Sequence, residues 1–159
     1  MIVDSTGLCP SIHNLDLSDN HIGQYSERNL EALKHLENLT ILVMARNGIR
    51  ELPLDMVKKM PDLQNFMMAG NGIRIIPLNF FSNNPRISHL DLSANELVAV
   101  DINMFESSNE LTNIYLQGNL ITNISQEIAQ RLDDLASKHH LQMLNILTAR
   151  AILTTCKTG

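Results

Sequence analysis

Aromatic residues are scarce in this 159-residue sequence, at 4 %, although apolar residues of all kinds make up 44 %. Any hydrophobic core must therefore be built mainly from leucine, isoleucine and methionine side chains. A chain of this length can bury one continuous core. The composition therefore predicts a single domain with an aliphatic interior.

Long apolar runs and an excess of basic residues are also lacking. No run of about 18 apolar residues occurs, so we predict no membrane-spanning segment. The first residues, Met1 to Asp4, do not give a basic start followed by an apolar core, so no secretory signal is visible. Acidic residues number 17 against 12 basic ones, a net charge of −5. This balance argues against nucleic acid as a general partner, since such binding depends on clustered Lys and Arg.

Catalytic and metal-binding motifs are missing as well. The histidines do not have the spacing that places two imidazoles around zinc, and we interpret them as surface or loop residues. The segment Gly70-Asn71-Gly72 lacks the Lys and Ser/Thr of a phosphate-binding loop. We therefore expect no catalytic residues, no metal site and no cofactor, and predict that the protein is not an enzyme. The six histidines are His13, His21, His35, His89, His139 and His140.

One residue type is instead present at a fixed phase. Asparagine recurs along the chain, and the last three intervals are each 24 residues. Around each of these asparagines the chain reads L-x-x-L-x-L-x-x-N-x-L, with other apolar residues replacing some leucines. A period of this length indicates a solenoid of stacked units. The asparagines are Asn20, Asn47, Asn71, Asn95 and Asn119.

The apolar positions of each unit predict a short strand. The second and third of them are two residues apart, so both side chains point to one face of a strand while the residue between them points to the other. Stacked units would give a parallel sheet with one face in a shared core. The apolar residues are Ile12, Leu15, Leu17 and Ile22; Leu39, Leu42, Met44 and Ile49; Leu63, Phe66, Met68 and Ile73; Ile87, Leu90, Leu92 and Leu97; and Leu111, Ile114, Leu116 and Ile121.

The recurring asparagine lies where the chain turns away from each strand. Its amide can donate to and accept from backbone groups of adjacent coils that would otherwise be buried without a partner. We therefore predict an internal ladder of asparagine hydrogen bonds. The alternative is a set of surface turn residues, which do not normally keep phase with a core pattern.

The second half of each unit predicts an irregular return segment. Leu52-Pro53 and Ile76-Pro77 share a phase, and Val100-Asp101 continues it without the proline. Proline suits an irregular return because it lacks an amide hydrogen and fixes one backbone angle. Apolar residues then close the outer side of each coil, and a second proline column precedes three units. These residues are Val57, Phe81 and Phe105, and Pro10, Pro61 and Pro85.

The ends of the chain depart from the regular form. Between Asn20 and Asn47, a short helix capped by Ser26 or a neighbour is predicted from Leu30, Leu33 and Leu36. A second helix, capped by Ser125, is predicted to run to about residue 140, followed by a degenerate unit with Ala149 where Asn is expected. We therefore divide the single domain into an incomplete repeat (1–9), about five full repeats (10–125) and an irregular helical or degenerate repeat (126–159). Further repeats or capping segments of a longer parent would cover the ends.

Cysteine usage is sparse. Cys9 and Cys156 are the only two and lie near opposite ends of the predicted stack, so we expect no disulfide between them. Cys9 aligns with Met60 and Asn84 in the repeat phase, which favours a small packed side chain. No cysteine-rich cap is visible at either end.

The free face of the predicted sheet is the candidate binding surface. Residues that alternate with the core leucines form three columns across it, and apolar side chains on such a face favour contact with a partner. The alternative is that Ile41 and Val43 simply suit a strand. We expect ligand contacts from Ile41, Val43, Arg46, Asn65, Met67, His89, Asp91, Asn113 and Tyr115. The columns are Asn14, Ile41, Asn65, His89 and Asn113; Asp16, Val43, Met67, Asp91 and Tyr115; and Ser18, Ala45, Ala69, Ser93 and Gln117.

These motifs make the chain, over about residues 10–125, similar to the leucine-rich repeat superfamily. The 24-residue form with proline and a later phenylalanine resembles the typical class of extracellular receptors and adhesion proteins, including Toll-like receptors and proteoglycan cores. The resemblance implies an α/β solenoid, a right-handed coil with a curved parallel β-sheet on the concave face and irregular or short helical returns on the convex face. It also implies a protein partner on the concave face.

The resemblance leaves the setting open between two compartments. Sequons at Asn38 and Asn123 are possible glycosylation sites and favour an extracellular or cell-surface location. The missing signal and caps fit either a fragment of a longer ectodomain or a cytoplasmic adaptor. Our first hypothesis is a receptor or adhesion module that binds a macromolecule. The alternatives are an intracellular regulatory subunit of an enzyme and a purely structural segment.

Overall fold

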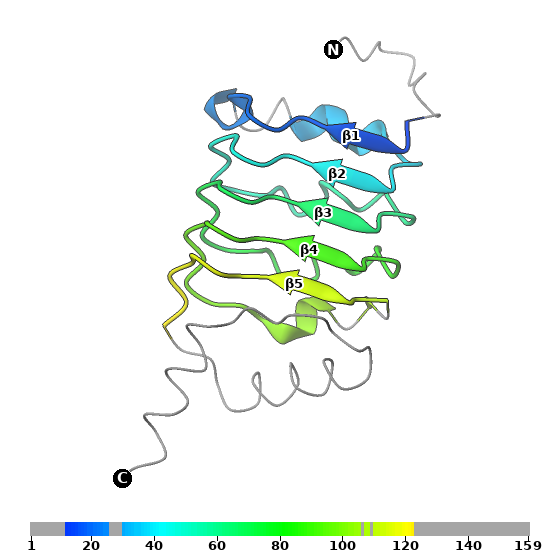
Figure 1. Ribbon diagram of the computed structural model, residues 1–159. Coiled ribbons are helices and arrows are strands. Elements are labelled where there is room, and N and C mark those ends of the chain that lie inside the picture. Colours follow the sequence, from blue (N-terminus) through cyan, green and yellow to red (C-terminus); the bar gives the residue numbers. More distant parts are fainter. Residues whose placement is uncertain (1–11, 26–29, 106, 109, 123–159) are drawn as a thin grey trace.

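Five short strands form one parallel sheet, in which each turn of the chain adds one strand (Figure 1). The computed structural model describes residues 12–25, 30–105, 107–108 and 110–122. The strands pair in chain order, so the solenoid predicted from the repeat is confirmed. We number each coil by the strand it contains. The strands are β1 (Asn14–Asp16), β2 (Ile41–Val43), β3 (Asn65–Met67), β4 (His89–Asp91) and β5 (Asn113–Tyr115).

The central residue of every strand points into the core. Leu15, Leu42, Phe66, Leu90 and Ile114 pair with one another in register across the sheet, and all five are buried. The residues on either side of them are exposed or half-buried. This alternation follows from the two-residue period of a strand. The core is therefore a stack of equivalent side chains from successive coils.

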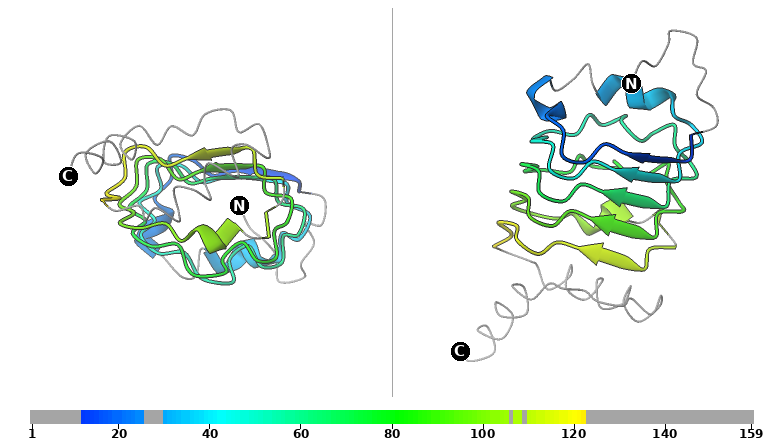
Figure 2. Two further views of the ribbon diagram at one scale, coloured as in Figure 1. Left: turned by 90° about the horizontal axis from the view of Figure 1, so that it is seen from below. Right: turned by 45° about the horizontal axis from the view of Figure 1, so that its top comes forward.

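The return segments lie on the side of the solenoid opposite the sheet (Figure 2). They contain tight turns that are closed by hydrogen bonds between residues three positions apart. The backbone N–H groups of Met56 and Phe80 donate to the carbonyl oxygens of Pro53 and Pro77, at 2.9 and 3.1 Å. In the next coil Asp101 occupies the proline position and accepts from Met104 at 3.2 Å. The 3-10 helices are η1 (Ile22–Tyr25), η2 (Ala32–His35) and η3 (Ile102–Phe105).

Four phenylalanines fill the middle of the core. Phe66 comes from β3, whereas Phe80, Phe81 and Phe105 come from the return segments of coils 3 and 4. Phe81 meets Phe80 and Phe66 edge to face, with ring centroids 4.9 and 5.4 Å apart, and stacks on Phe105 at 6.5 Å. The four phenylalanines of the sequence are therefore concentrated at one place, where they join the sheet to the returns.

Several predicted features of the chain ends fall partly or wholly outside the described residues. The apolar residues Leu30, Leu33 and Leu36 are buried, and the segment that carries them includes η2. Its proposed cap, Ser26, lies outside the described residues. So do the helix after Ser125, the degenerate last unit, both cysteines and the incomplete repeat 1–9.

The ladder asparagines join each coil to the one before it. The Asn71 Nδ2 group donates to the carbonyl oxygens of Met44 and Met68, at 3.0 and 2.9 Å. Its Oδ1 atom accepts from the backbone N–H groups of Asn47 and Ile49, both at 3.0 Å. Three of these four backbone groups belong to the preceding coil. Without the Asn71 side chain, these groups would lose this hydrogen-bond partner.

The scheme repeats along the stack and ends at coil 1. Asn95 and Asn119 donate to the preceding coil through Met68 and Leu92, at 3.0 and 2.8 Å. Asn20 in coil 1 is exposed and donates to its own coil, at Leu17 and Ser18. The asparagine phase therefore specifies contacts between coils wherever a preceding coil is described.

Replacing Asn71 with alanine is expected to lower the free energy of unfolding by about 1–3 kcal/mol, because it leaves buried backbone groups without partners. The matched control is Asn65→Ala on the outward side of β3, which removes the same side-chain amide from a half-buried position. Urea unfolding followed by circular dichroism measures both. Equally small losses in the two variants would contradict the stabilising role of the ladder.

Candidate functional site

The outward side chains of the strands form an ordered surface. We use the name sheet face for the three columns defined above. Across the first column Asn14, Ile41, Asn65, His89 and Asn113 pair in that order. The second column pairs Asp16, Val43, Met67, Asp91 and Tyr115 in the same way. The register places residues from five separate segments of the sequence side by side on one surface.

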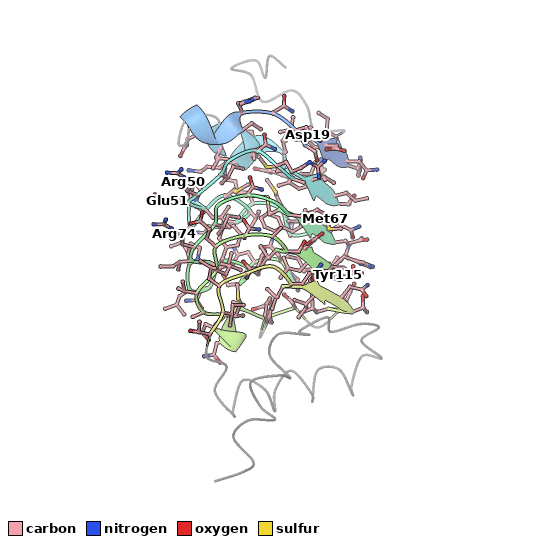
Figure 3. All side chains as sticks on the ribbon, turned by 60° about the vertical axis from the view of Figure 1, so that its left-hand side comes forward. Asp19, Arg50, Glu51, Met67, Arg74 and Tyr115 are labelled. Carbon is pink, nitrogen blue, oxygen red and sulfur yellow. The ribbon has the colours of Figure 1, made fainter. Side chains whose placement is uncertain are left out.

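Three of the predicted ligand-binding residues form a continuous apolar patch. Ile41 and Val43 lie on β2, and Met67 lies beside Val43 on β3. All three are half-buried in spite of pointing outward. Tyr115 lies on the same face (Figure 3), but Asp91 on β4 separates it from Met67. The apolar patch therefore consists of Ile41, Val43 and Met67, and Tyr115 stands apart from it.

Two aspartates border the apolar patch, and both are held by a serine two residues later. The Asp16 Oδ1 atom accepts from the Ser18 backbone N–H at 2.8 Å. The Asp91 Oδ1 atom accepts from the Ser93 backbone N–H at 2.9 Å and from the Ser93 hydroxyl at 2.6 Å. Hydrogen bonds from the Ser18 side chain and backbone lower the pKa of Asp16 below its usual 3.8. The Ser18 bonds favour the ionised form of the Asp16 carboxylate, which accepts them.

Arg46 lies in the turn after β2 and not on the sheet face. Its Nε and Nη2 atoms donate to the two carboxylate oxygens of Asp19 in coil 1, each at 2.6 Å. This bidentate contact lowers the pKa of Asp19, and both side chains remain well exposed. Both residues have a positive φ, 57° for Asp19 and 53° for Arg46. Arg46 is therefore engaged in joining coils 1 and 2, although it was predicted to contact a ligand.

Comparison with known proteins agrees with this geometry. The family model described as leucine rich repeat matches residues 37–97. The crystal structure of the leucine-rich repeat domain of APL1B is similar with a TM-score of 0.56 and 26 % identity, over 60 % of this chain and 28 % of that one. Residues 37–97 therefore match the leucine-rich repeat family, and the five described coils have the leucine-rich repeat solenoid fold. A crystal structure of an LRIM1/APL1C complex is also similar, with a TM-score of 0.58 and 23 % identity, over 62 % of this chain and 18 % of that one.

The leucine-rich repeat region extends beyond the matched residues. Coils 1 and 5 lie outside residues 37–97, yet each contributes a strand and a phased asparagine to the same sheet. This chain spans less than a third of the length of either similar structure. A search of curated proteins gave no match.

A column of hydroxyl residues next to the sheet face was not recognised in the sequence. Thr40, Ser88 and Thr112 each directly precede a strand, and each hydroxyl donates to a backbone carbonyl of the preceding coil. The acceptors are His13, Gln64 and Ser88, at 3.0, 3.4 and 3.0 Å. Their common phase was visible in the sequence. This second, shorter ladder supports the edge of the sheet where the strands begin.

Neighbouring polar groups also hold two predicted ligand residues in place. The Ser88 hydroxyl lies 2.9 Å from His89 Nδ1, and the Asn113 Nδ2 group donates to the Thr112 hydroxyl at 3.2 Å. Both His89 and Asn113 are half-buried on the sheet face. Their side chains are therefore oriented by the residue that precedes each of them.

Asn84 was also missed as a structural residue. It lies on the return side, is completely buried, and donates to the carbonyl oxygens of Val57 and Met60 in the preceding coil, at 2.9 and 2.8 Å. Met60 occupies the same phase one coil earlier, so the sequence offered no repeated asparagine as a signal. Asn84 joins the return segments of coils 2 and 3 as the main ladder joins the turns.

The described residues contain no cluster of three or more His, Cys, Asp or Glu arranged to hold a metal ion. In the same part of the chain, no helix is both long and apolar enough to cross a membrane. A hollow of about 280 Å³ lies beside the Asp19–Arg46 pair and is lined by Asp19, Asn20, His21, Arg46, Asn47 and Gly48. Its walls are polar turns, and the ion pair within it is already satisfied.

One of the two predicted glycosylation sites, Asn38, lies within the described residues. Asn38 is exposed in the turn before β2, as an occupied site requires. Thr40 of the same sequon also has a structural role, because its hydroxyl belongs to the column described above. Asn123 lies outside the described residues. Glycosylation at both positions stays a prediction.

Proposed function

We propose that the sheet face of this leucine-rich repeat domain binds a protein partner. The observation that carries the proposal is the apolar patch of Ile41, Val43 and Met67 on a surface directed away from the core. Apolar side chains grouped on an otherwise polar surface indicate a contact site. The similar LRIM1/APL1C structure is that of a complex, which agrees with a protein partner here.

The rigidity of the face also supports binding. Each strand is hydrogen-bonded to its neighbours, and the asparagine and hydroxyl ladders tie the turns on both sides of the strands. Side chains held in place in the free protein lose little conformational entropy when a partner binds. The role proposed is recognition without catalysis, with no cofactor.

For the setting, we propose an extracellular or cell-surface receptor or adhesion protein. The support comes from the 24-residue repeat form and from the exposed Asn38 sequon. Detection of an N-glycan on Asn38 in protein secreted from its native host would support this setting. A parent protein that is retained in the cytoplasm would contradict it and would favour an intracellular adaptor.

The binding proposal predicts that Met67→Ala and Tyr115→Ala each weaken partner binding by about tenfold, because the proposal places both among the minority of interface residues whose truncation costs over 1 kcal/mol. Partners captured by the full-length parent protein supply the ligand for this measurement. The matched control is Leu78→Ala, because Leu78 is apolar and 64 % exposed but lies on the return side.

All three variants are expected to keep the circular dichroism spectrum of the parent. Unchanged binding by both sheet-face variants would contradict the proposal. Loss of fold in either would show that its side chain belongs to the core, which is a register error of one residue.

A further inference from the structure

Apart from histidine, the ionisable side chains of the sheet face that are charged at neutral pH are all acidic. Its three columns contain two carboxylates, Asp16 and Asp91, and no lysine, arginine or glutamate. Two arginines flank the strands, but each is engaged in an ion pair, Arg46 with Asp19 and Arg86 with Asp62 at 2.7 Å. Within the described residues, no lysine or arginine forms an ion pair with Asp16 or Asp91. Arg46 also acts on Asp16 electrostatically, but no described lysine or arginine pairs directly with either carboxylate of the face.

The two carboxylates flank the apolar patch within one column. Reading across the strands, the order is Asp16, Val43, Met67 and Asp91. Asp16 and Asp91 lie three strand spacings apart, which is about 14 Å at the usual distance between neighbouring strands. Both are held by the serine two residues later, so their positions are set before any partner binds. The column therefore has a fixed pattern of acidic, apolar, apolar and acidic groups.

We infer that this column recognises an extended protein segment in which two Lys or Arg residues, four positions apart, flank a central apolar residue. In an extended chain such residues lie about 13 Å apart and on the same side as the residue midway between them. A segment lying across the strands can thus place one cation at each aspartate and its apolar side chain on Val43 and Met67. This inference rests on the proposed function, because it names the partner class of the same face.

A helical segment matches the spacing less well. Residues seven, eight or eleven positions apart share a helix face, and they lie about 10.5, 12 or 16.5 Å apart along the axis. The extended spacing of about 13 Å is closer than any of these to the separation of about 14 Å between the two aspartates. One side of a helix would also cover more than a single column. The extended segment is therefore the occupant that both the charge and the spacing favour.

The test uses a fluorescein-labelled peptide, Gly-Ser-Arg-Ser-Leu-Ser-Arg-Ser-Gly, and a second peptide with glutamate in place of both arginines. Fluorescence anisotropy measures the affinity of each peptide for the complete chain and for Asp16→Asn, Asp91→Asn and the double variant. Asparagine keeps an oxygen that can accept the Ser18 or Ser93 bond while removing the charge. The control is Glu51→Gln, which changes the net charge equally but lies on a flank away from Met67 (Figure 3).

We expect the arginine peptide to bind and the glutamate peptide not to bind. Each aspartate variant should weaken binding about threefold to tenfold, the range of a partly exposed ion pair or a charge-assisted hydrogen bond. The Glu51→Gln protein should bind as the parent does. Raising the salt concentration from about 50 to 500 mM should weaken binding by the parent more than by the double variant, because salt screens exposed charges.

Three results would overturn the inference: no binding of the arginine peptide at about 1 mM, equal binding of both peptides, or unchanged binding by the double variant. These outcomes are separable from failure of the proposed function. If Met67→Ala and Tyr115→Ala weaken capture of the native partner while both aspartate variants do not, the sheet face binds a protein but not through a basic segment. If none of these variants changes capture, the proposed function itself fails.

Discussion

Replacing Phe81 with alanine is expected to lower the free energy of unfolding by about 3–5 kcal/mol, the usual range for a phenylalanine truncated in a packed core. The side chain is completely buried. It contacts Phe66 of the sheet, Phe80 of its own return segment and Phe105 of the next coil. The loss therefore affects packing within a coil, between coils, and between the sheet and the returns. In a solenoid, each coil depends on the interface with its neighbours for stability.

Urea unfolding at neutral pH measures this loss, and Phe81→Leu is the control. Leucine keeps an apolar side chain of similar volume at the same place, so we expect a loss of about 1–1.5 kcal/mol. A loss in Phe81→Ala no greater than in Phe81→Leu would show that the filled volume at this position does not hold the middle coils together.

Replacing Gly23 with alanine is expected to cost about 3 kcal/mol or more, because overpacking against rigid backbone cannot be relieved by a side-chain rotation. A Cβ atom at this position would lie 2.1 Å from the Gly48 carbonyl oxygen, 2.3 Å from the Gly48 carbonyl carbon and 2.7 Å from the Ile49 nitrogen. The Gly23 N–H also donates to the Asn47 carbonyl at 3.0 Å, which holds the two segments together. Coil 1 would have to move away from coil 2 to admit the methyl group.

The control for this variant is Gly48→Ala in the facing turn. A Cβ atom on Gly48 would meet nothing within 4 Å, but its φ of +69° is unfavourable for alanine. The expected loss is about 1–2 kcal/mol, the cost of the left-handed conformation for a residue with a side chain. Thermal unfolding of both variants distinguishes the two causes. A smaller loss for Gly23→Ala than for Gly48→Ala would contradict the close approach of the coils.

The repeat phase made much of the architecture predictable. Leu42 and Met44, with their equivalents in the other units, alternate with outward residues, and the two-residue period of a strand then assigns each side chain to a face. A spacing of 27 residues between coils 1 and 2, and of 24 residues between later coils, brings equivalent positions of neighbouring coils together. The order of the columns across the sheet follows from these two facts alone. The apolar patch of Ile41, Val43 and Met67 could therefore be located from the sequence.

Other features depend on distances that the repeat does not specify. The partner of Arg46 is an example, because the sequence placed Arg46 beside the apolar residues of the face, and only the fold shows that it pairs with Asp19 of coil 1. The repeat phase already places Tyr115 two strands away from Met67, with Asp91 between them. Only the structure shows that Ser93 holds the Asp91 carboxylate at that place. The buried amide of Asn84 replaces a methionine of the preceding coil and follows no repeated pattern.

The sequence by itself determined the solenoid, the parallel register and which side chains leave the core, since these follow from a period that every coil shares. Only the tertiary structure decided which polar groups are already satisfied and how closely the backbones approach, as at Gly23 and Gly48. The physical reason is that hydrogen bonds and steric contacts change over fractions of an ångström. A repeat phase fixes which residues are neighbours across coils, but it does not fix their separation or orientation at that precision.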